Sequence, residues 1–159
     1  MRKKIVATLL IGATLVSSGA IVANASSFYE PQESYLEENI LSACEICGQK
    51  YGVCPELLMA LVETESSGNQ DAINGTCYGV CQINSAVWGG DYDTVYKQVD
   101  KACQILLQYA DSHCGDINCA LMKYNGEPNA EKLCDQGRQT TYSKTVLKRA
   151  EELERLHDK

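Results

Sequence analysis

The sequence predicts a mainly α-helical domain with an irregular, partly strand-like stretch in its middle. Two patterns indicate this fold class. Apolar residues recur at helical spacing through five segments, and the stretch 69–90 is instead rich in Gly, Asn and Cys. In addition, all nine cysteines follow residue 43, as expected for a small domain stapled by disulfides. No internal repeat or low-complexity tract interrupts this pattern.

The first residues resemble an export signal. Basic residues 2–4 precede an apolar run over 5–16, and the small residues Ala23-Asn24-Ala25 then form an A-x-A cleavage site. The apolar run is too short and too interrupted for a convincing membrane span, so a retained anchor is the less favoured alternative. We therefore expect a signal peptide over 1–25, a secreted or wall-associated protein, and a mature chain of 134 residues.

The elements can be placed in order along the mature chain. Residues 26–34 are a polar tether, and the folded domain is expected over 35–159. Ser34 followed by Glu37 has the pattern of a capping box, which predicts a first helix that ends near Gly52.

The second helix begins at Pro55, because proline suits a first turn where its missing amide hydrogen costs nothing. It ends at Ser66-Ser67-Gly68. Strand-like pieces are expected around 78–83. Three further helices follow: one capped by Asp93, one capped by Asp116, and a last one over 140–156.

Glu65 lies on the apolar face of the second helix. It follows Leu61 by four residues and Val62 by three, whereas Glu63 is expected on the opposite, solvated face. A carboxyl group among apolar neighbours has a raised pKa, which a glycosidase general acid needs. The plainer alternative is a helix-end glutamate that is satisfied by nearby backbone amides.

The charge of the chain argues against some partners. The formal net charge is −7, and residues 1–25 hold three of the 14 basic residues and none of the 21 acidic ones, so the mature chain carries −10. A surface this acidic repels nucleic acid and anionic lipid. A neutral sugar chain is compatible with it.

The cysteines of an exported chain are expected to form disulfides. Eight of the nine can pair, and the ninth is left free or links two chains; otherwise we expect a monomer. The alternative is a zinc-dependent module built on Cys44-x-x-Cys47 with Cys54 and a distant partner. We expect His113 and His157 to be surface residues, and we expect no metal and no cofactor.

Three segments, taken in order, resemble the soluble lytic transglycosylase (SLT) domain of the lysozyme-like superfamily. They are the run over 60–68, which contains Glu65-Ser66, the run over 79–83 with its Gly-x-x-Gln pattern, and the run over 120–126 with its Ala-x-x-x-Tyr-Asn pattern. A later tyrosine before a terminal helix also matches. The resemblance covers about residues 40 to 150, so that 35–159 becomes a lytic transglycosylase-like catalytic domain of lysozyme-like α+β fold.

The resemblance implies a role for each matching residue. Glu65 is the single acid and base, and Ser66 belongs to the end of its helix. Gln82 contacts sugar N-acetyl groups, and Tyr124 hydrogen-bonds near the catalytic carboxyl. The other substrate-binding residues that it implies are Asn125, Gly79 and Tyr142.

The residues considered without the resemblance have plainer interpretations. Gln82 is then a solvated loop residue and Tyr124 a core tyrosine, while Trp88 is either core or a platform for a sugar ring. The chain also departs from the family pattern. Cys81 replaces a large apolar residue and is a candidate partner of Cys77, and the segment after Asn125 is one residue shorter than usual.

The activity that the resemblance implies is cleavage of the bond between N-acetylmuramic acid and N-acetylglucosamine in peptidoglycan, with closure of a 1,6-anhydro ring. One alternative is a goose-type lysozyme-like hydrolase in which Asp71 or Asp91 holds the attacking water. Another is a peptidoglycan-binding or assembly domain without turnover. Family members of this size commonly serve secretion or conjugation assemblies, which are therefore the expected protein partners.

Overall fold

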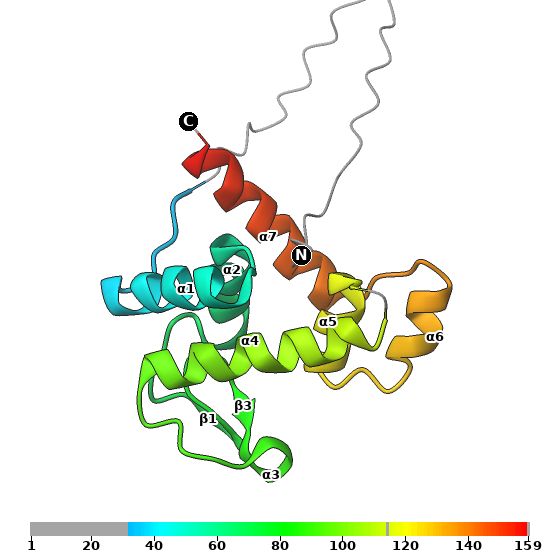
Figure 1. Cartoon of the computed structure of the whole chain (residues 1–159), viewed down its shortest axis with the longest axis horizontal. Helices are drawn as coiled ribbons and strands as arrows, with labels where there is room; N and C mark the ends of the chain where they lie inside the picture. The colour runs from blue at the N-terminus through cyan, green and yellow to red at the C-terminus, as the bar shows by residue number, and fades with distance from the viewer. Residues whose placement is uncertain (1–31, 114, 159) are drawn as a thin grey trace, which may run out of the picture.

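The computed structural model describes residues 32–113 and 115–158 (Figure 1). The predicted signal peptide over 1–25 lies outside the described residues, as do Cys114 and all of the tether before residue 32. None of the described helices combines the length and the apolar character that a membrane crossing requires.

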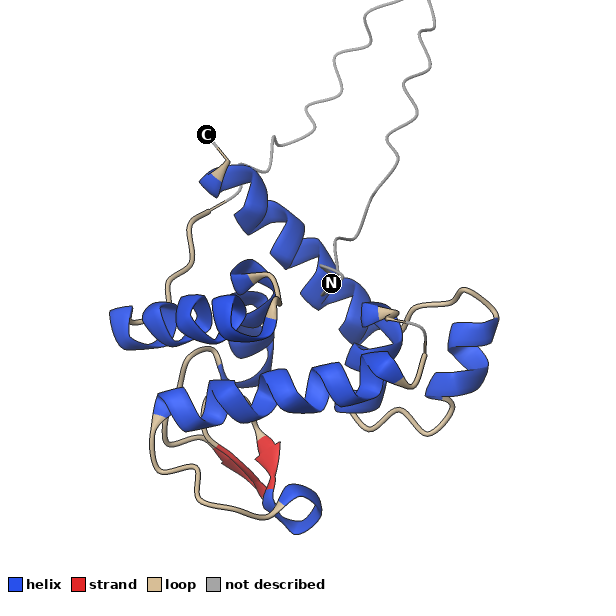
Figure 2. Ribbon diagram, in the orientation of Figure 1, coloured by secondary structure: helices blue, strands red, loops and turns tan. Residues whose placement is uncertain are grey.

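The described chain is mainly helical, as the sequence predicts, with a small sheet at one end (Figure 2). In chain order the elements are α1 (Glu38–Tyr51), α2 (Pro55–Ser66), β1 (Ile73–Asn74), β2 (Cys77–Tyr78), β3 (Ile83–Asn84), α3 (Ser85–Trp88), α4 (Val95–Asp111), α5 (Ile117–Tyr124), α6 (Ala130–Asp135) and α7 (Thr141–His157).

Several predicted helix boundaries are confirmed. Gly52 ends α1 in the left-handed conformation with φ 69°, which glycine adopts without strain. Pro55 opens α2, and Ser67 ends it. Asp116 caps α5 by accepting hydrogen bonds from the backbone of Asn118 and Cys119.

Two predicted caps are wrong. Glu37 is the N-cap residue of α1, and it makes no side-chain cap. The Ser34 hydroxyl instead donates to Glu63 at 2.6 Å, a tertiary contact that local sequence does not reveal. Thr94, rather than Asp93, caps α4 and accepts from Lys97. Asp93 forms an ion pair with Lys97 at 2.7 Å.

Helix α2 is the centre of the core. Its residues 57–62 are all buried, so this helix is covered on every side, as expected for a core helix. It packs most extensively against α7 and also against α1, which in turn packs on α4. These contacts fix the end of α2, where Glu65 lies, relative to three other helices.

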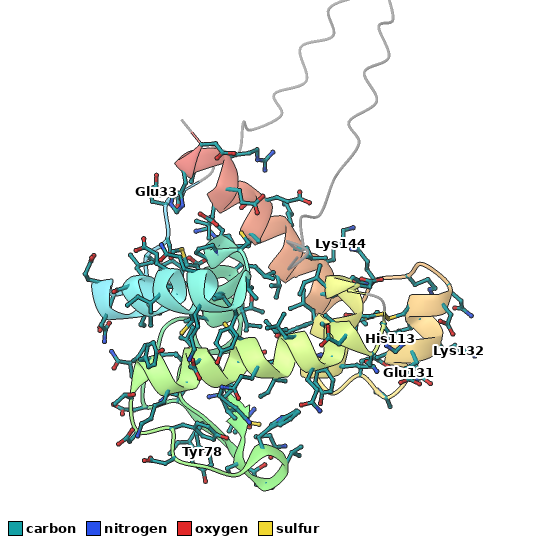
Figure 3. All side chains as sticks on the ribbon, viewed as in Figure 1. Glu33, Tyr78, His113, Glu131, Lys132 and Lys144 are labelled. Atoms are coloured by element: carbon teal, nitrogen blue, oxygen red, sulfur yellow. A yellow bond between two sulfur atoms is a disulfide. The ribbon has the colours of Figure 1, made fainter. Side chains whose placement is uncertain are left out.

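The strands form an antiparallel sheet in the order β1-β2-β3, with Ile73 opposite Tyr78 and Tyr78 opposite Ile83. They lie below α4 in Figure 1, next to the short helix α3. Tyr78, in the middle strand β2, has an exposed side chain and is labelled in Figure 3. The prediction of strand-like pieces around 78–83 is thus confirmed, whereas α3 was not predicted.

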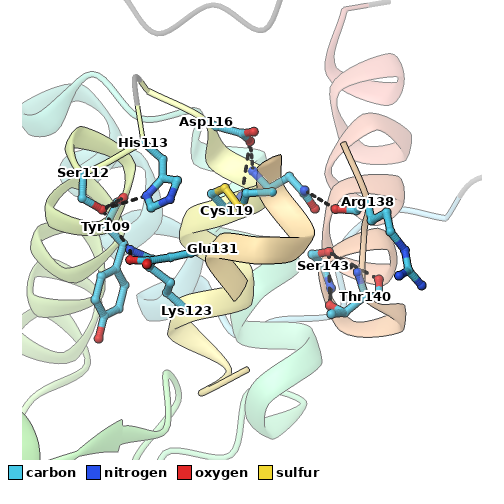
Figure 4. The surroundings of a disulfide bond; sticks show 12 residues. Tyr109, Ser112, His113, Asp116, Cys119, Lys123, Glu131, Arg138, Thr140 and Ser143 are labelled. Atoms are coloured by element: carbon cyan, nitrogen blue, oxygen red, sulfur yellow. Dashed lines mark hydrogen bonds and ion pairs between the residues drawn. A yellow bond between two sulfur atoms is a disulfide. The ribbon is translucent and has the colours of Figure 1, made fainter. Parts of the chain in front are cut away.

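Helix α6 was not predicted either. A disulfide between Cys119 and Cys134 joins it to α5, and an ion pair of 2.9 Å between Lys123 and Glu131 lies beside that bond (Figure 4). Among the described residues this is the one disulfide, and six cysteines are thiols. The structure therefore departs from the expectation of four bridges and from a bond between Cys77 and Cys81. The free cysteines are Cys44, Cys47, Cys54, Cys77, Cys81 and Cys103.

Candidate active site

Glu65 is the last residue but one of α2, and its side chain is half-buried. The helix stops directly behind it, because Ser67 takes a left-handed conformation with φ 55°. Helical periodicity placed Glu65 on the same face as Leu61 and Val62, and both of these residues are fully buried. The carboxyl group therefore lies where the central helix leaves the core.

The hydroxyl of Tyr142 donates a short hydrogen bond to Oε1 of Glu65. Tyr142 stands in the first turn of α7, and that turn is fixed by a reciprocal cap between Thr140 and Ser143, both labelled in Figure 4. The sequence resemblance assigned Tyr142 to substrate binding. The structure places it against the carboxyl group itself.

The environment of Glu65 changes its proton affinity. Burial among apolar neighbours raises the pKa of this carboxyl group, and the hydrogen bond from Tyr142 opposes part of that rise. Burial and the neighbouring Glu65 carboxylate in turn raise the pKa of the Tyr142 hydroxyl, which therefore stays protonated as a donor. A carboxyl group that holds its proton toward neutral pH can act as a general acid.

Glu63 does not lie on a solvated face, as its helical position had suggested. Only 7% of its side chain is exposed, and Arg149 of α7 pairs with it at 2.7 Å. Helical spacing predicted the direction in which Glu63 points, but not that α7 covers that direction. Two acids two residues apart thus have different partners: a cation for Glu63, and a neutral hydroxyl for Glu65.

The Gly-x-x-Gln segment is joined to the end of α2. The Ser66 hydroxyl donates to the carbonyl of Val80 at 2.9 Å, and Tyr124 donates to the carbonyl of Cys81 at 2.6 Å. The Tyr124 hydroxyl thus holds the segment beside Glu65 rather than bonding to the carboxyl group. Ser66 has the structural role that the resemblance implied.

Gln82 has an unusual backbone conformation for a non-glycine residue, with φ 47°. Its amide nitrogen donates to the carbonyls of Ala72 and Gly79 at 3.1 and 3.0 Å. Within the described part of the chain, its amide oxygen accepts no hydrogen bond. This oxygen is therefore available to an N–H donor from a ligand, such as the N-acetyl group of a sugar.

Gly79 is required for packing. It has φ 72°, and an added Cβ would come within 2.1 Å of the side-chain oxygen of Gln98. That oxygen accepts a hydrogen bond from the backbone N–H of Val80 at 2.8 Å, so the side chain of Gln98 fixes the position of the Gly-x-x-Gln segment. Sequence analysis missed Gln98, although it stands three residues after Val95 on the apolar face of α4. A contact of Gly79 with a glycan stays a prediction.

Two of the candidate residues make no hydrogen bond to the Glu65 carboxyl group. Asn125 is exposed at the C-terminus of α5. Trp88 packs edge-on against Tyr109 of α4 with ring centres 5.8 Å apart, and the ammonium group of Lys101 lies 5.2 Å from the Trp88 ring. The structure thus gives Trp88 a packing role, and the contribution of Asn125 to a sugar site stays a prediction.

Two hollows on the surface of the described chain lie away from Glu65, which lines neither of them. One of about 640 Å³ lies beside α6, between Lys123 and Gln136. The other, of about 450 Å³, lies between the start of α4 and the loop around Asp71. The carboxyl group instead lies against Tyr142, and a glycan groove over it stays a prediction.

The zinc alternative predicted from Cys44, Cys47 and Cys54 is not assembled. Cys44 and Cys47 are buried in the core, whereas Cys54 lies at the opposite end of α2 from Glu65. Among the described residues, the side chains close enough to share a metal ion are Cys54, Glu56 and Glu154.

A mainly helical domain with a half-buried acid at the end of its central helix and a small sheet beyond it belongs to the lysozyme-like class. The family model described as the transglycosylase SLT domain matches residues 42–145, and the chain belongs to this family. Neither the curated proteins nor the solved structures compared with the chain gave a match.

Proposed function

We propose that the protein is a peptidoglycan lytic transglycosylase that cleaves the β-1,4 bond between N-acetylmuramic acid and N-acetylglucosamine. The observation that carries this proposal is Glu65, a half-buried acid with a raised pKa that accepts a hydrogen bond from Tyr142. Membership of the SLT family supports a peptidoglycan substrate. The protein acts outside the cytoplasm, in the wall, because its substrate is there.

The mechanism requires one carboxyl group. Protonated Glu65 gives its proton to the glycosidic oxygen, and the bond from that oxygen to C1 of the muramic acid breaks. The Glu65 carboxylate then removes the proton from the C6 hydroxyl of the same sugar, and O6 bonds to C1. The product ends in a 1,6-anhydro ring, Glu65 has recovered its proton, and no water is consumed.

Tyr142 positions the acid and adjusts its strength. Its hydrogen bond to Oε1 leaves Oε2 of Glu65 free to reach the glycosidic oxygen. The same bond stabilises the carboxylate that forms after the proton has left. Tyr142 thereby keeps the pKa of Glu65 from rising so far that the carboxylate could no longer act as a base.

The contacts of the aspartates favour the single-acid mechanism over hydrolysis. Asp91, one candidate for holding a nucleophilic water, is exposed and pairs with Lys97 at 2.9 Å. Asp71, the other candidate, is exposed in the loop before β1. Exposure, and for Asp91 the pairing with Lys97, leave neither aspartate the fixed position that the second carboxyl group of a hydrolase needs to flank the scissile bond.

Gln82 is the residue best placed to bind a sugar beside the acid. Its free amide oxygen can accept from an N-acetyl N–H, and its nitrogen is already used to hold the loop. Tyr124 supports the same loop through Cys81. This arrangement predicts a preference for N-acetylated sugars.

Digestion of purified peptidoglycan tests the proposal, with mass analysis of the soluble fragments. Wild type is compared with Glu65→Gln and with Glu45→Gln, which makes the same chemical change at an exposed position of α1. We expect anhydro fragments from wild type and Glu45→Gln. Loss of an acid catalyst typically costs about 10²–10⁴ in rate, and we expect Glu65→Gln to lose at least that much.

Three results would overturn the proposal. Fragments heavier by one water than the anhydro products, with free reducing ends, would indicate the hydrolase instead. Binding of glycan by wild type without any release of fragments would indicate a binding or assembly domain. Fragment release that survives in Glu65→Gln would remove Glu65 from the mechanism.

A further inference from the structure

A second cluster of reactive side chains lies at the other end of the α2–α7 pair. The two helices run antiparallel, so the start of α2 meets the last turns of α7. Cys54 is the N-cap residue of α2 and Glu56 follows in its first turn, while Glu154 and His157 come from the end of α7. None of these residues takes part in the proposed reaction.

The distances within this cluster are short. The sulfur of Cys54 is 2.9 Å from Oε2 of Glu56 and 2.9 Å from Oε1 of Glu154. One ligand atom from each of these three residues lies within 4.8 Å of the other two. Nδ1 of His157 is 2.8 Å from the second oxygen of Glu56. A thiol and two carboxyl groups therefore converge from two helices, and the imidazole of His157 lies on the outer side of Glu56.

The cluster has fewer hydrogen-bond donors than acceptors. A thiol has one proton, so the sulfur can donate to only one of its two carboxylate neighbours. The other contact sets a sulfur lone pair against a carboxylate oxygen at 2.9 Å, which is repulsive. A cation between the three ligand atoms would remove this conflict, because each of them could then face positive charge.

His157 holds Glu56 from outside the cluster. Its Nδ1 is paired with Oε1 of Glu56, while its Nε2 lies 3.3 Å from the carboxylate of Glu33. Carboxylates that bind a metal are themselves hydrogen-bonded by outer residues, and a second contact fixes the imidazole ring in this position. Glu33, labelled beside the end of α7 in Figure 3, supplies that second contact from a separate segment of the chain.

We propose that Cys54, Glu56 and Glu154 form a binding site for a divalent transition-metal ion such as Zn²⁺, with His157 orienting Glu56 from outside. Thiolate and carboxylate are among the ligand types that zinc takes, at about 2.0–2.3 Å in a tetrahedral arrangement. Ligand atoms around such an ion stand roughly 3.5 Å apart. The cluster needs only a small expansion from 2.9 Å to reach that spacing. This site differs from the expectation of no metal and uses ligands other than Cys44 and Cys47.

The bound ion would act as a clamp rather than in catalysis. Glu65 follows Cys54 by eleven positions, which is about 16 Å along a helix axis. The ion would join the start of α2 to the end of α7. The start of α7 carries Tyr142, so the clamp would hold the helix that sets the catalytic hydrogen bond. Partial exposure of His157 and Glu154 leaves the site open to ions in solution.

Metal binding to the full folded chain tests this inference, with Zn²⁺ and Co²⁺ as the probes. We expect one equivalent of Zn²⁺ by elemental analysis after gel filtration. At a concentration about a hundredfold above Kd, we expect a rise in Tm of roughly 5–10 °C, reversed by a chelator. Co²⁺ should give the near-ultraviolet absorption of a metal–thiolate bond. At a temperature well below Tm, removal of zinc should leave glycan cleavage unchanged, which separates this test from that of the proposed function.

Two pairs of variants identify the ligands. Cys54→Ser and Glu154→Gln should abolish the thermal shift, and Cys54→Ser should also abolish the Co²⁺–thiolate band. Cys77→Ser and Glu151→Gln make the same chemical changes outside the cluster and should behave as wild type. The inference is overturned if wild type binds no stoichiometric Zn²⁺, or if the thiolate band survives in Cys54→Ser.

Discussion

At position 65 the protein keeps a carboxyl group among apolar side chains, with one hydroxyl as its partner. This placement favours the protonated form and opposes ionisation. The burial that lets Glu65 hold and donate a proton also means that its ionised form destabilises the folded state. Such opposition between activity and stability is common at active sites.

The first prediction concerns the stability of Glu65→Gln. The pKa of Glu65 in the native protein is raised above its ordinary value of 4.5, so the unfolded chain loses this proton first as pH rises. Between the two pKa values the native state binds more protons, and the free energy of unfolding therefore falls with rising pH. Near neutral pH, the free energy of unfolding of Glu65→Gln should be at least that of wild type, and higher by up to about 0.5–2 kcal/mol.

Thermal unfolding of both proteins across acidic and neutral pH measures this difference. It should shrink as pH falls below 4.5, where both native and unfolded Glu65 are protonated. A Glu65→Gln protein that is clearly less stable than wild type near neutral pH would mean that the native state favours the ionised carboxylate.

The second prediction concerns Tyr142→Phe. This variant keeps the ring and removes the hydrogen bond, which opposes the rise in the pKa of Glu65. The pKa should therefore rise further, and the alkaline limb of the pH–rate profile should move to higher pH. We expect a lower kcat with little change in KM, measured as fragment release. An unchanged alkaline limb would show that Tyr142 does not act on Glu65.

At the scale of elements, the pairing of α2 with α7 determines the site. Tyr142 from the first turn of α7 meets Glu65, and Arg149 from its middle meets Glu63. The Arg149 guanidinium also donates to the backbone carbonyl of Gln32, so it ties the segment before α1 to the same pair of helices. The proposed metal site lies at the other end of this helix pair, where α2 begins and α7 ends.

The third prediction concerns the pair formed by Glu63 and Arg149, whose side chains are 7% and 15% exposed. Arg149→Met leaves a carboxylate buried without its cation, so breaking the pair should cost about 3–5 kcal/mol. Lys144→Met likewise replaces a cation by methionine, at an exposed position of α7, and should cost less than about 0.5 kcal/mol. Denaturant unfolding measures both, and equal effects would contradict a buried ion pair.

Helix boundaries with a strong local signal could be predicted, and those that depend on tertiary contacts could not. Pro55 and Asp116 act within their own first turns, and both were placed correctly. Ser34 had a local partner in Glu37, yet its hydroxyl bonds to Glu63. Helices α3 and α6 are four and six residues long, too short for an apolar period to emerge.

At the scale of the whole molecule, the fold class and the half-buried position of Glu65 were predictable, because both depend on periodicity. The family pattern then supplied Gln82 and Tyr142. The actual partner of Tyr142 was not predictable, because position 142 is 77 residues from position 65 in the sequence. The contact of Gln98 with Gly79 and Val80 was not predictable either, because it arises only when α4 packs against the loop.

The fourth prediction concerns the cysteines of the whole chain. Cys44, Cys47, Cys81 and Cys103 are buried thiols, so alkylation of the native protein should spare all four. Unfolding without a reductant should expose them to modification, while the bond between Cys119 and Cys134 should remain. Peptide mapping after alkylation measures each site. Thiols that stay unmodified after unfolding would be paired, as the sequence alone had suggested.

Cleavage of purified peptidoglycan in ¹⁸O-labelled water tests the central claim most directly, because it asks whether water enters the product. A single acid at position 65 that closes the ring through the C6 hydroxyl predicts anhydro-muramic fragments without label at the new end. Fragments that carry one ¹⁸O at a new reducing end would contradict it and require a water-activating base beside Glu65.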